Sequence, residues 1–282
     1  MNLQALKDRI KVIGKEKGLS APEVWNQLAF ERFLARLAKS EHHDKFIFKG
    51  GLLLSQYISI GRETVDLDFL VKNMQVSAKV IEDALAEIAA IDLGDSFKFE
   101  YDSIEQLDQP HMEYDGFRVK LKMSYETMTD KVQIDIGVGD IVDPNEMDYQ
   151  TFSFKGVPLF SDSISIQVYP LETILAEKLE TIVSKGAINS RMKDYHDALL
   201  IIRSGHLPEG SEVKSAVEAT FSNRKTDLQF PISFDEDETR GLQRLWAAHL
   251  KKLGARAKAL GLPEEIQVVI SDLNKWVAAA LK

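Results

Sequence analysis

The chain has 282 residues, 44% of them hydrophobic and 28% charged, a balance typical of a globular protein with one large domain or two ordinary ones. It contains no cysteine, which excludes disulfides, thiolate metal sites and cysteine nucleophiles. The net charge of −9 argues against a protein that coats nucleic acid non-specifically. Because no apolar run approaches the roughly 18 residues that cross a bilayer, and the first residues lack a signal-peptide core, we expect a cytoplasmic protein without membrane contact.

The hydrophobic pattern predicts helices up to about residue 40, then short strands alternating with helices, then a helical remainder. Strands are expected at 45–49, 64–72, 97–101, 117–125, 131–138 and 164–168. Helices between them are expected at 52–60 and 78–90, and the first helix after the last strand at 171–185. We therefore predict two domains, 1–165 with the strands and 166–282 with helices only.

The glycine pair Gly50-Gly51 separates the first predicted strand from the helix that follows it. Glycine lets backbone N–H groups approach a phosphate closely, and the helix N-terminus adds partial positive charge. Such turns are also common without a ligand, so the pair predicts a phosphate site only together with the acidic residues that follow.

Three aspartates lie within otherwise apolar strands. Asp66 and Asp68 alternate with Val65, Leu67 and Phe69, and should therefore share one face of a strand.

The third, Asp135, lies between Ile134 and Ile136. Buried like charges need donors or a cation, and carboxylate oxygens suit Mg²⁺, with Mn²⁺ as the alternative ion. The other interpretation is a solvent-facing strand edge. The apolar flanks favour a metal site in which Asp135 is the third ligand or a general base.

A single lysine, Lys178, interrupts the apolar stripe of the predicted helix 171–185, which otherwise contains Leu171, Ile174, Leu175 and Ile182. A lysine on a core face needs an anionic partner. That partner is either a structural aspartate or the triphosphate of a bound nucleotide, and the sequence leaves both open.

Two further aspartates, Asp194 and Asp197, lie three residues apart and should occupy one side of a helix. For Asp194 the alternative is a helix-capping role in the first turn. Between Arg240 and Lys258 the chain has only basic charges, which is compatible with a helix that contacts a polyanion or with an ordinary solvated face.

These motifs, taken in order from residue 49 to 197, resemble the AbiEii family of nucleotidyltransferase toxins. The matching segments are Lys49-Gly50-Gly51, Arg62-x-Thr64-x-Asp66-x-Asp68, Gln133-Ile134-Asp135, Leu175-Ala176-Glu177-Lys178 and Arg191-x-Lys193-Asp194-x-x-Asp197. The resemblance implies an α+β fold with a DNA-polymerase-β-like core, a mixed sheet flanked by helices, and a helical C-terminal domain that completes the active site. It also implies a toxin of a toxin–antitoxin or abortive-infection system, active in phage defence, that transfers a nucleoside monophosphate from an NTP to the 3′ end of tRNA and so blocks translation. The partner that it implies is an antitoxin encoded nearby with a winged-helix DNA-binding domain.

The resemblance also assigns roles residue by residue. Asp66, Asp68 and Asp135 would bind the metal, and with Lys178 and Asp194 they would form the catalytic set. The residues implied to contact the nucleotide are Lys49, Gly50, Gly51, Arg62, Thr64, Lys178, Arg191, Lys193 and Asp197. Many relatives carry Ser or Thr directly after the glycines, whereas Leu52 stands here, so backbone donors would have to hold the phosphates.

Three other functions use the same residues. A same-fold enzyme could transfer the nucleotide to a protein or a small molecule, which the overall acidity favours. An inactive nucleotide-binding or partner-binding module would be expected to have lost at least one of the carboxylates or Lys178, and all are present. A Toprim-type nuclease also uses Asp-x-Asp, but it needs a glutamate on an earlier strand, and the strand before Gly50 has none.

Overall fold

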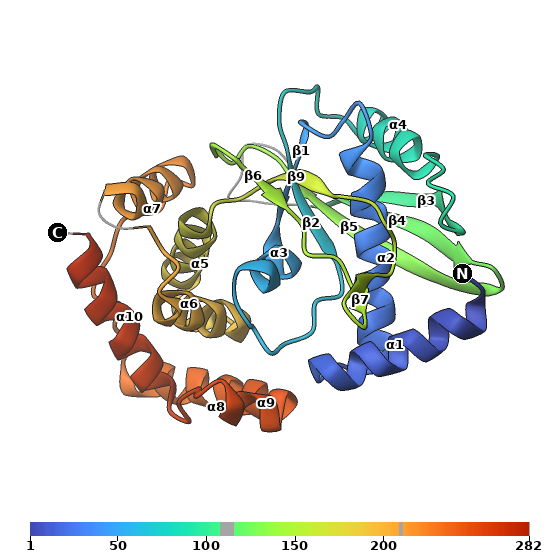
Figure 1. The fold of residues 1–282 in the computed structure, drawn as a ribbon. Helices are drawn as coiled ribbons and strands as arrows, with labels where there is room; N and C mark the ends of the chain where they lie inside the picture. The colour runs from blue at the N-terminus through green and yellow to red at the C-terminus, as the bar shows by residue number, and fades with distance from the viewer. Residues whose placement is uncertain (108–115, 209–210, 282) are drawn as a thin grey trace. The chain divides into compact units, whose positions relative to one another are not determined.

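The computed structural model describes residues 1–107, 116–208 and 211–281, and the chain divides into two compact units (Figure 1). The first unit comprises Met1–Leu53, Glu63–Gly139 and Pro144–Val168, and the second comprises Leu54–Arg62, Asp140–Asp143 and Tyr169–Lys282. The predicted fold class is confirmed: a mixed sheet is flanked by helices, and the C-terminal region is helical.

The first unit is built on a seven-stranded sheet with the order β3-β4-β5-β2-β1-β9-β6. Its strands are β1 (Phe46–Lys49), β2 (Leu67–Val71), β3 (Phe97–Leu107), β4 (Gly116–Tyr125), β5 (Met128–Gly137), β6 (Asn145–Asp148) and β9 (Ser165–Val168). The pairs β2–β5 and β1–β9 are parallel and the other pairs are antiparallel. A separate hairpin is formed by β7 (Ser153–Phe154) and β8 (Val157–Pro158).

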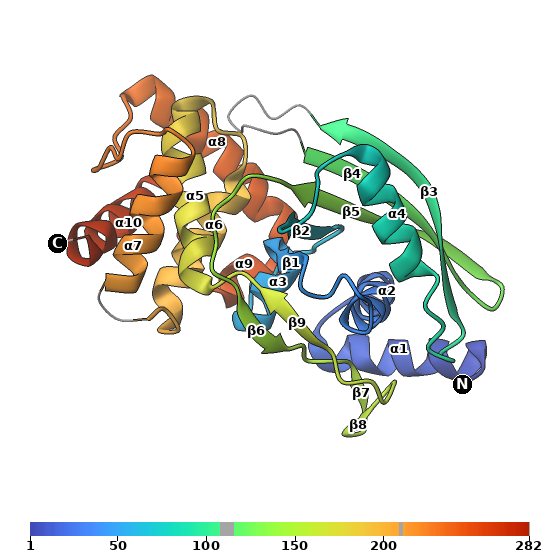
Figure 2. The ribbon, with the colours of Figure 1, turned by 90° about the horizontal axis from the view of Figure 1, so that it is seen from above.

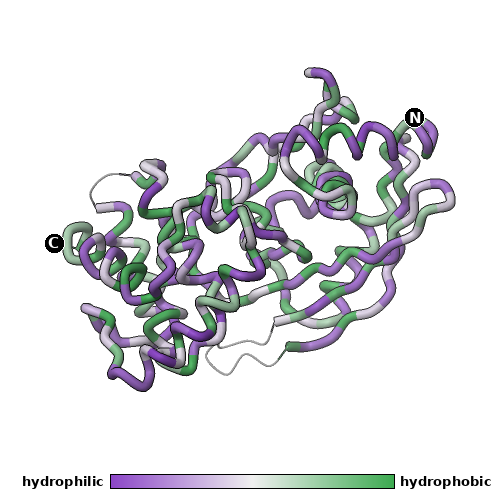
Figure 3. The backbone as a smooth tube through the Cα atoms, turned by 90° about the horizontal axis from the view of Figure 1, so that it is seen from below, coloured by the Kyte–Doolittle hydropathy of each residue, from purple (hydrophilic) through white to green (hydrophobic). Residues whose placement is uncertain are grey.

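Buried residues alternate with half-buried or exposed ones along β4 and, from Val132 on, along β5. Hydrophobic and hydrophilic colours alternate in the same way along the long strands (Figure 3). The apolar side chains of these strands face α2 (Ala21–Ala38) and α4 (Ala78–Ala89), which cover one face of the sheet (Figure 2). Helix α1 (Leu3–Lys17) packs on α2. One face of the sheet therefore holds the core, and the other carries the polar side chains.

The second unit is helical. It contains α5 (Leu171–Lys185), η1 (Gly186–Ile188), α6 (Met192–Ser204), α7 (Ser211–Asn223), α8 (Glu236–Leu253), α9 (Ala255–Ala259) and α10 (Ile266–Ala280). Helix α3 (Gly50–Tyr57) begins in the first unit and ends in the second. Among the described residues, no helix combines the length and the apolar character needed to cross a membrane.

Three of the predicted strands differ from the structure by three residues or more. The strand expected at 131–138 begins earlier, at Met128, where its pairing with β4 starts. The strand expected at 64–72 begins only at Leu67, where the pairing with β5 starts, so Asp66 lies in a bend and Val65 is 59% exposed rather than packed. The strand expected at 97–101 continues to Leu107 through a bulge between Tyr101 and Ser103, which conceals the alternation of its second half. Strands β6, β7 and β8 were not predicted, because they are polar or only two residues long.

Candidate active site

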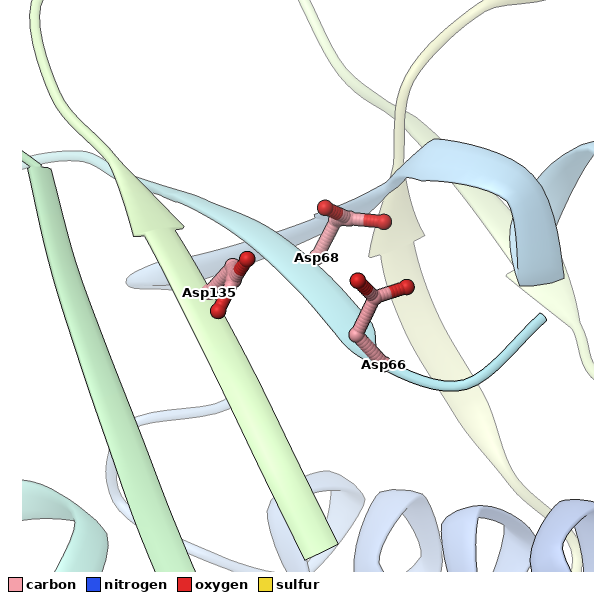
Figure 4. A group of neighbouring side chains, drawn as sticks. All are labelled: Asp66, Asp68 and Asp135. Carbon is pink, nitrogen blue, oxygen red and sulfur yellow. The ribbon is translucent and has the colours of Figure 1, made fainter. Parts of the chain in front are cut away.

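Three carboxylates meet on the polar face of the sheet in the first unit (Figure 4). Asp68 on β2 is the register partner of Asp135 on β5, and Asp66 extends from the bend just before β2. Each residue offers one carboxylate oxygen such that the three oxygens lie within 4.8 Å of one another, and all three residues are half-buried. The alternation that places Leu67 and Phe69 in the core turns both aspartates, Asp66 and Asp68, toward the same space.

The strand register extends this group into a row of charges across five strands. Successive partners in the row are Lys49, Asp68, Asp135, Arg118 and Glu105. The Arg118 guanidinium donates from Nε to Oδ1 of Asp135 at 2.9 Å and from its terminal nitrogen to Oδ2 at 2.7 Å. This bidentate bond raises the pKa of Arg118 further above its ordinary value and holds the Asp135 carboxylate in one orientation.

Sequence reasoning missed Arg118, although a signal was present. Strands β4 and β5 form a hairpin in which Tyr125 pairs with Met128 across the two-residue turn Glu126-Thr127. Counting back from that turn places Arg118 opposite Asp135. The turn lacks the glycine that marks most two-residue hairpins, and Glu126 itself adopts a positive φ of 51°.

The donor set fits a divalent cation. All three groups are carboxylates, the hard oxygen ligands that Mg²⁺ and Mn²⁺ prefer, and three such charges at this separation repel one another unless a cation is present. Arg118 compensates one of the three charges but engages both oxygens of Asp135. A cation bound here would therefore share Asp135 with Arg118.

The first glycine of the Gly50-Gly51 pair is required by the geometry of this site. Gly50 begins α3 with a φ of 79°, and a Cβ atom at this position would overlap the Asp68 carboxylate. The pair therefore brings the N-terminus of α3 against the acidic group. Leu52, which follows the glycine pair, is buried in the core, and the structure places Thr64 in a buried position before Asp66.

Most of the predicted site residues of the second unit belong to one ionic network. Arg62 donates to both carboxylate oxygens of Asp197, at 2.8 and 2.7 Å, and Lys178 Nζ lies 2.6 Å from Oδ2 of the same residue. Asp197 is fully buried. Burial alone would raise its pKa, but the charges and hydrogen bonds of Lys178 and Arg62 prevail and hold the pKa of Asp197 below its usual range.

The network continues along α6. Lys178 also lies 3.5 Å from Oδ1 of Asp194, and Arg191 Nε donates to Oδ2 of Asp194 at 2.9 Å. Asp194 lies in the first turn of α6, where an acidic side chain interacts favourably with the helix N-terminus, and there it makes ion pairs with both Lys178 and Arg191. Lys193 is exposed and, within the part of the chain that the structure describes, forms no ion pair with this network.

The apolar stripe around Lys178 is present as expected, because Leu171, Ile174, Leu175 and Ile182 are all buried. The lysine has the anionic partner that its position demands, and in this structure the partner is Asp197.

Two histidines, His196 and His249, lie next to this ionic network. His196 bonds through Nε2 to the Ile60 carbonyl and through Nδ1 to His249. Burial is the main cause that lowers the pKa of His196 to about 4. The imidazole is therefore neutral at pH 7, and its Nε2–H donates to the carbonyl.

Known proteins share the fold of this chain. The structure resembles MenT4, a nucleotidyltransferase toxin from Mycobacterium tuberculosis H37Rv, with a TM-score of 0.54 at 15% identity over 97% of this chain and 94% of that one. A match to JHP933 from Helicobacter pylori has a TM-score of 0.45 at 14% identity and covers 93% of this chain and 97% of that one. No curated protein sequence matches. The family model for the nucleotidyl transferase AbiEii toxin of type IV toxin–antitoxin systems matches residues 32–268, and the chain therefore belongs to this family of nucleotidyltransferases.

Proposed function

We propose that this nucleotidyltransferase transfers a nucleoside monophosphate from an NTP to the 3′ end of tRNA and thereby blocks translation, as the toxin of an abortive-infection system. The family supplies the reaction class and implies an NTP substrate and an antitoxin partner. The observation that carries the proposal within this chain is the convergence of Asp66, Asp68 and Asp135, with oxygens within 4.8 Å. The proposal includes an antitoxin with a winged-helix DNA-binding domain.

In this proposal the three aspartates hold Mg²⁺ or Mn²⁺. When bound, the ion would stabilise negative charge on the phosphates and make an acceptor hydroxyl easier to deprotonate. The backbone N–H groups of Gly50 and Gly51, at the start of α3, bind phosphate oxygens.

The chemical step is a substitution at the α-phosphorus. The oxygen of the acceptor hydroxyl forms the new bond, the bond to the bridging oxygen breaks, and pyrophosphate leaves. Asp135 accepts the hydroxyl proton, and its bond with Arg118 keeps this carboxylate oriented. In this proposal Lys178 contacts the nucleotide, and Asp194 belongs to the last motif of the active site, as the family motifs imply.

The proposal is tested by incubating purified protein with Mg²⁺ and each α-labelled NTP in turn, either with total tRNA or with an RNA-free protein extract. We expect label on tRNA with at least one NTP, and no label with Asp68→Asn. Label on a protein with none on tRNA would show that the acceptor is not RNA. The absence of label on any acceptor with folded protein would favour an inactive binding module.

A further inference from the structure

The polar face of the sheet continues beyond the three carboxylates, where it carries four lysines. Lys98 lies on β3, Lys120 and Lys122 on β4, and Lys131 on β5. We call this surface the lysine face. On the opposite face the neighbours of these residues, among them Val119, Leu121 and Val132, are fully buried. The lysines therefore project from a rigid sheet whose other side is packed, and their spacing is fixed by the strand register.

The charges on the lysine face are only partly compensated. Lys122 and Lys131 both pair with Asp102, at 3.1 and 2.8 Å, and their side chains are 59% and 61% exposed. One carboxylate cannot neutralise two ammonium groups. Glu100 is the register partner of Lys122, whereas Lys98 and Lys120 have no ion-pair partner among the described residues. The lysine face is thus positive within a chain of net charge −9.

The lysines also follow a line that starts at the carboxylates. Lys120 is the partner of Gln133, two residues before Asp135, and Lys122 is the partner of Lys131, four residues before it. At about 3.3 Å per residue, these pairs lie about 7 and 13 Å from Asp135 along β5. At the end of β5 away from Asp135, a hollow of about 420 Å³ is lined by three lysines, two hydroxyl residues, two acidic residues and a methionine: Lys98, Lys122, Lys131, Ser124, Thr129, Glu100, Asp130 and Met123.

The chemistry of this surface selects phosphates rather than bases. The outward positions of β4 and β5 between Arg118 and Asp135 are occupied by lysine, serine, threonine and glutamine, without an aromatic ring on which a base could stack. Flexible ammonium groups at regular spacing suit the repeating charge of a sugar–phosphate backbone. We propose that the lysine face binds the backbone of the RNA strand whose 3′ end is presented to the carboxylates, an inference that rests on the proposed RNA acceptor.

The test is the binding of a fluorescein-labelled single-stranded RNA 12-mer, followed by anisotropy without NTP or metal between 50 and 200 mM KCl. The variant is Lys120→Glu/Lys122→Glu, and the matched control is Lys7→Glu/Lys11→Glu, which changes two exposed lysines of α1 in the same unit. We expect the variant to weaken binding at least tenfold at 100 mM KCl. The slope of log affinity against log salt should fall by about 1.4, because each lost contact with a single strand contributes about 0.7. The control should change neither quantity.

An unchanged affinity in the variant, or an equal loss in the control, would overturn the proposal. Competition by polyglutamate as effective as competition by unlabelled RNA of equal charge would overturn it in favour of an acidic protein partner. If the glutamate variant fails to fold, as judged by circular dichroism, Lys120→Gln/Lys122→Gln takes its place with the same expected direction.

The RNA-binding measurement and the label-transfer measurement can fail independently of each other. RNA binding that depends on the lysines, without transfer of label from any NTP, would reject the proposed function and keep the lysine face. Label transfer to RNA that depends on Asp68, together with unchanged binding by the lysine variant, would reject the role of the lysine face and keep the proposed function.

Discussion

The change of Gly50 to alanine isolates the close contact between the glycine turn and the acidic group. The added methyl group would overlap the Asp68 carboxylate and lie 2.6 Å from the Asp68 Cβ. The carboxylate could rotate away, but the Cβ atom could not, because Asp68 is held between its register partners Lys49 on β1 and Asp135 on β5. The substitution must therefore displace α3 or β2, and with either of them the geometry of the carboxylates.

The magnitude follows from two contributions. A non-glycine residue at a φ of 79° costs about 1–2 kcal/mol, and a forced overlap in a packed region costs about 1–3 kcal/mol more. Gly50→Ala should thus lower the free energy of unfolding by about 2–5 kcal/mol. Gly94 provides the matched control, because its φ is 64° and a Cβ atom added there would meet nothing within 4 Å. Gly94→Ala has only the conformational contribution, about 1–2 kcal/mol.

Urea unfolding measures the stability of both variants, and nucleotide transfer under conditions where both are folded measures their activity. A displacement of about 1 Å in a reacting constellation can lower the rate about 100-fold, so Gly50→Ala should lose activity to roughly this extent while Gly94→Ala keeps it. If the two variants lost equal stability and equal activity, the contact between Gly50 and Asp68 would not have the role assigned to it.

Three further predictions concern charged groups. Asp197→Asn should destabilise the protein by about 3–5 kcal/mol in urea unfolding, because it leaves Lys178 and Arg62 without their shared anion. Lys178→Met should destabilise it less, because Arg62 still pairs with Asp197, and a larger loss for Lys178→Met would contradict this network. Arg118→Ala should tighten Mn²⁺ binding about three- to tenfold in a calorimetric titration, because the half-exposed guanidinium no longer competes with the ion for Asp135. Weaker binding would contradict this and would mean that Arg118 helps the site more by orienting Asp135 than it hinders it by competing for the carboxylate. Burial raises the pKa of Glu31 to about 7, so the folded protein keeps a proton that the unfolded chain releases above about pH 4.5. The free energy of unfolding should therefore fall as the pH rises from 5 to 8, by at most roughly 3 kcal/mol. The melting temperature measured over this pH range checks this prediction, and an equal fall in Glu31→Gln would refute Glu31 as its origin.

The short-range part of the site follows from the sequence. The two-residue period of a strand is local, so the common direction of Asp66 and Asp68 can be predicted without knowing what pairs with β2. The same is true of the buried stripe around Lys178, because the helical period is also local. The fold was predicted from the resemblance to the family, whose motifs occur in the same order along this chain.

The partners across the sheet could not be predicted in the same way. Asp68 and Asp135 become neighbours through a parallel pairing of β2 with β5, which no turn between them specifies. The anion that Lys178 meets is Asp197 on another helix, and the same carboxylate is also held by Arg62, which is far away in sequence. Long-range pairing therefore decides which charges compensate one another, and local patterns do not record it.

The proposed function requires the carboxylates gathered at β2 and β5 to support nucleotide transfer. The most direct measurement is the single-turnover rate of transfer from an α-labelled NTP to tRNA, in the presence of Mg²⁺, for the unmodified protein, Asp68→Asn and the control Asp83→Asn, an exposed aspartate on α4. We expect Asp68→Asn to abolish transfer while its melting temperature stays close to that of the unmodified protein, and Asp83→Asn to retain the full rate. Transfer by folded Asp68→Asn at the rate of the control would show that these carboxylates do not support the reaction.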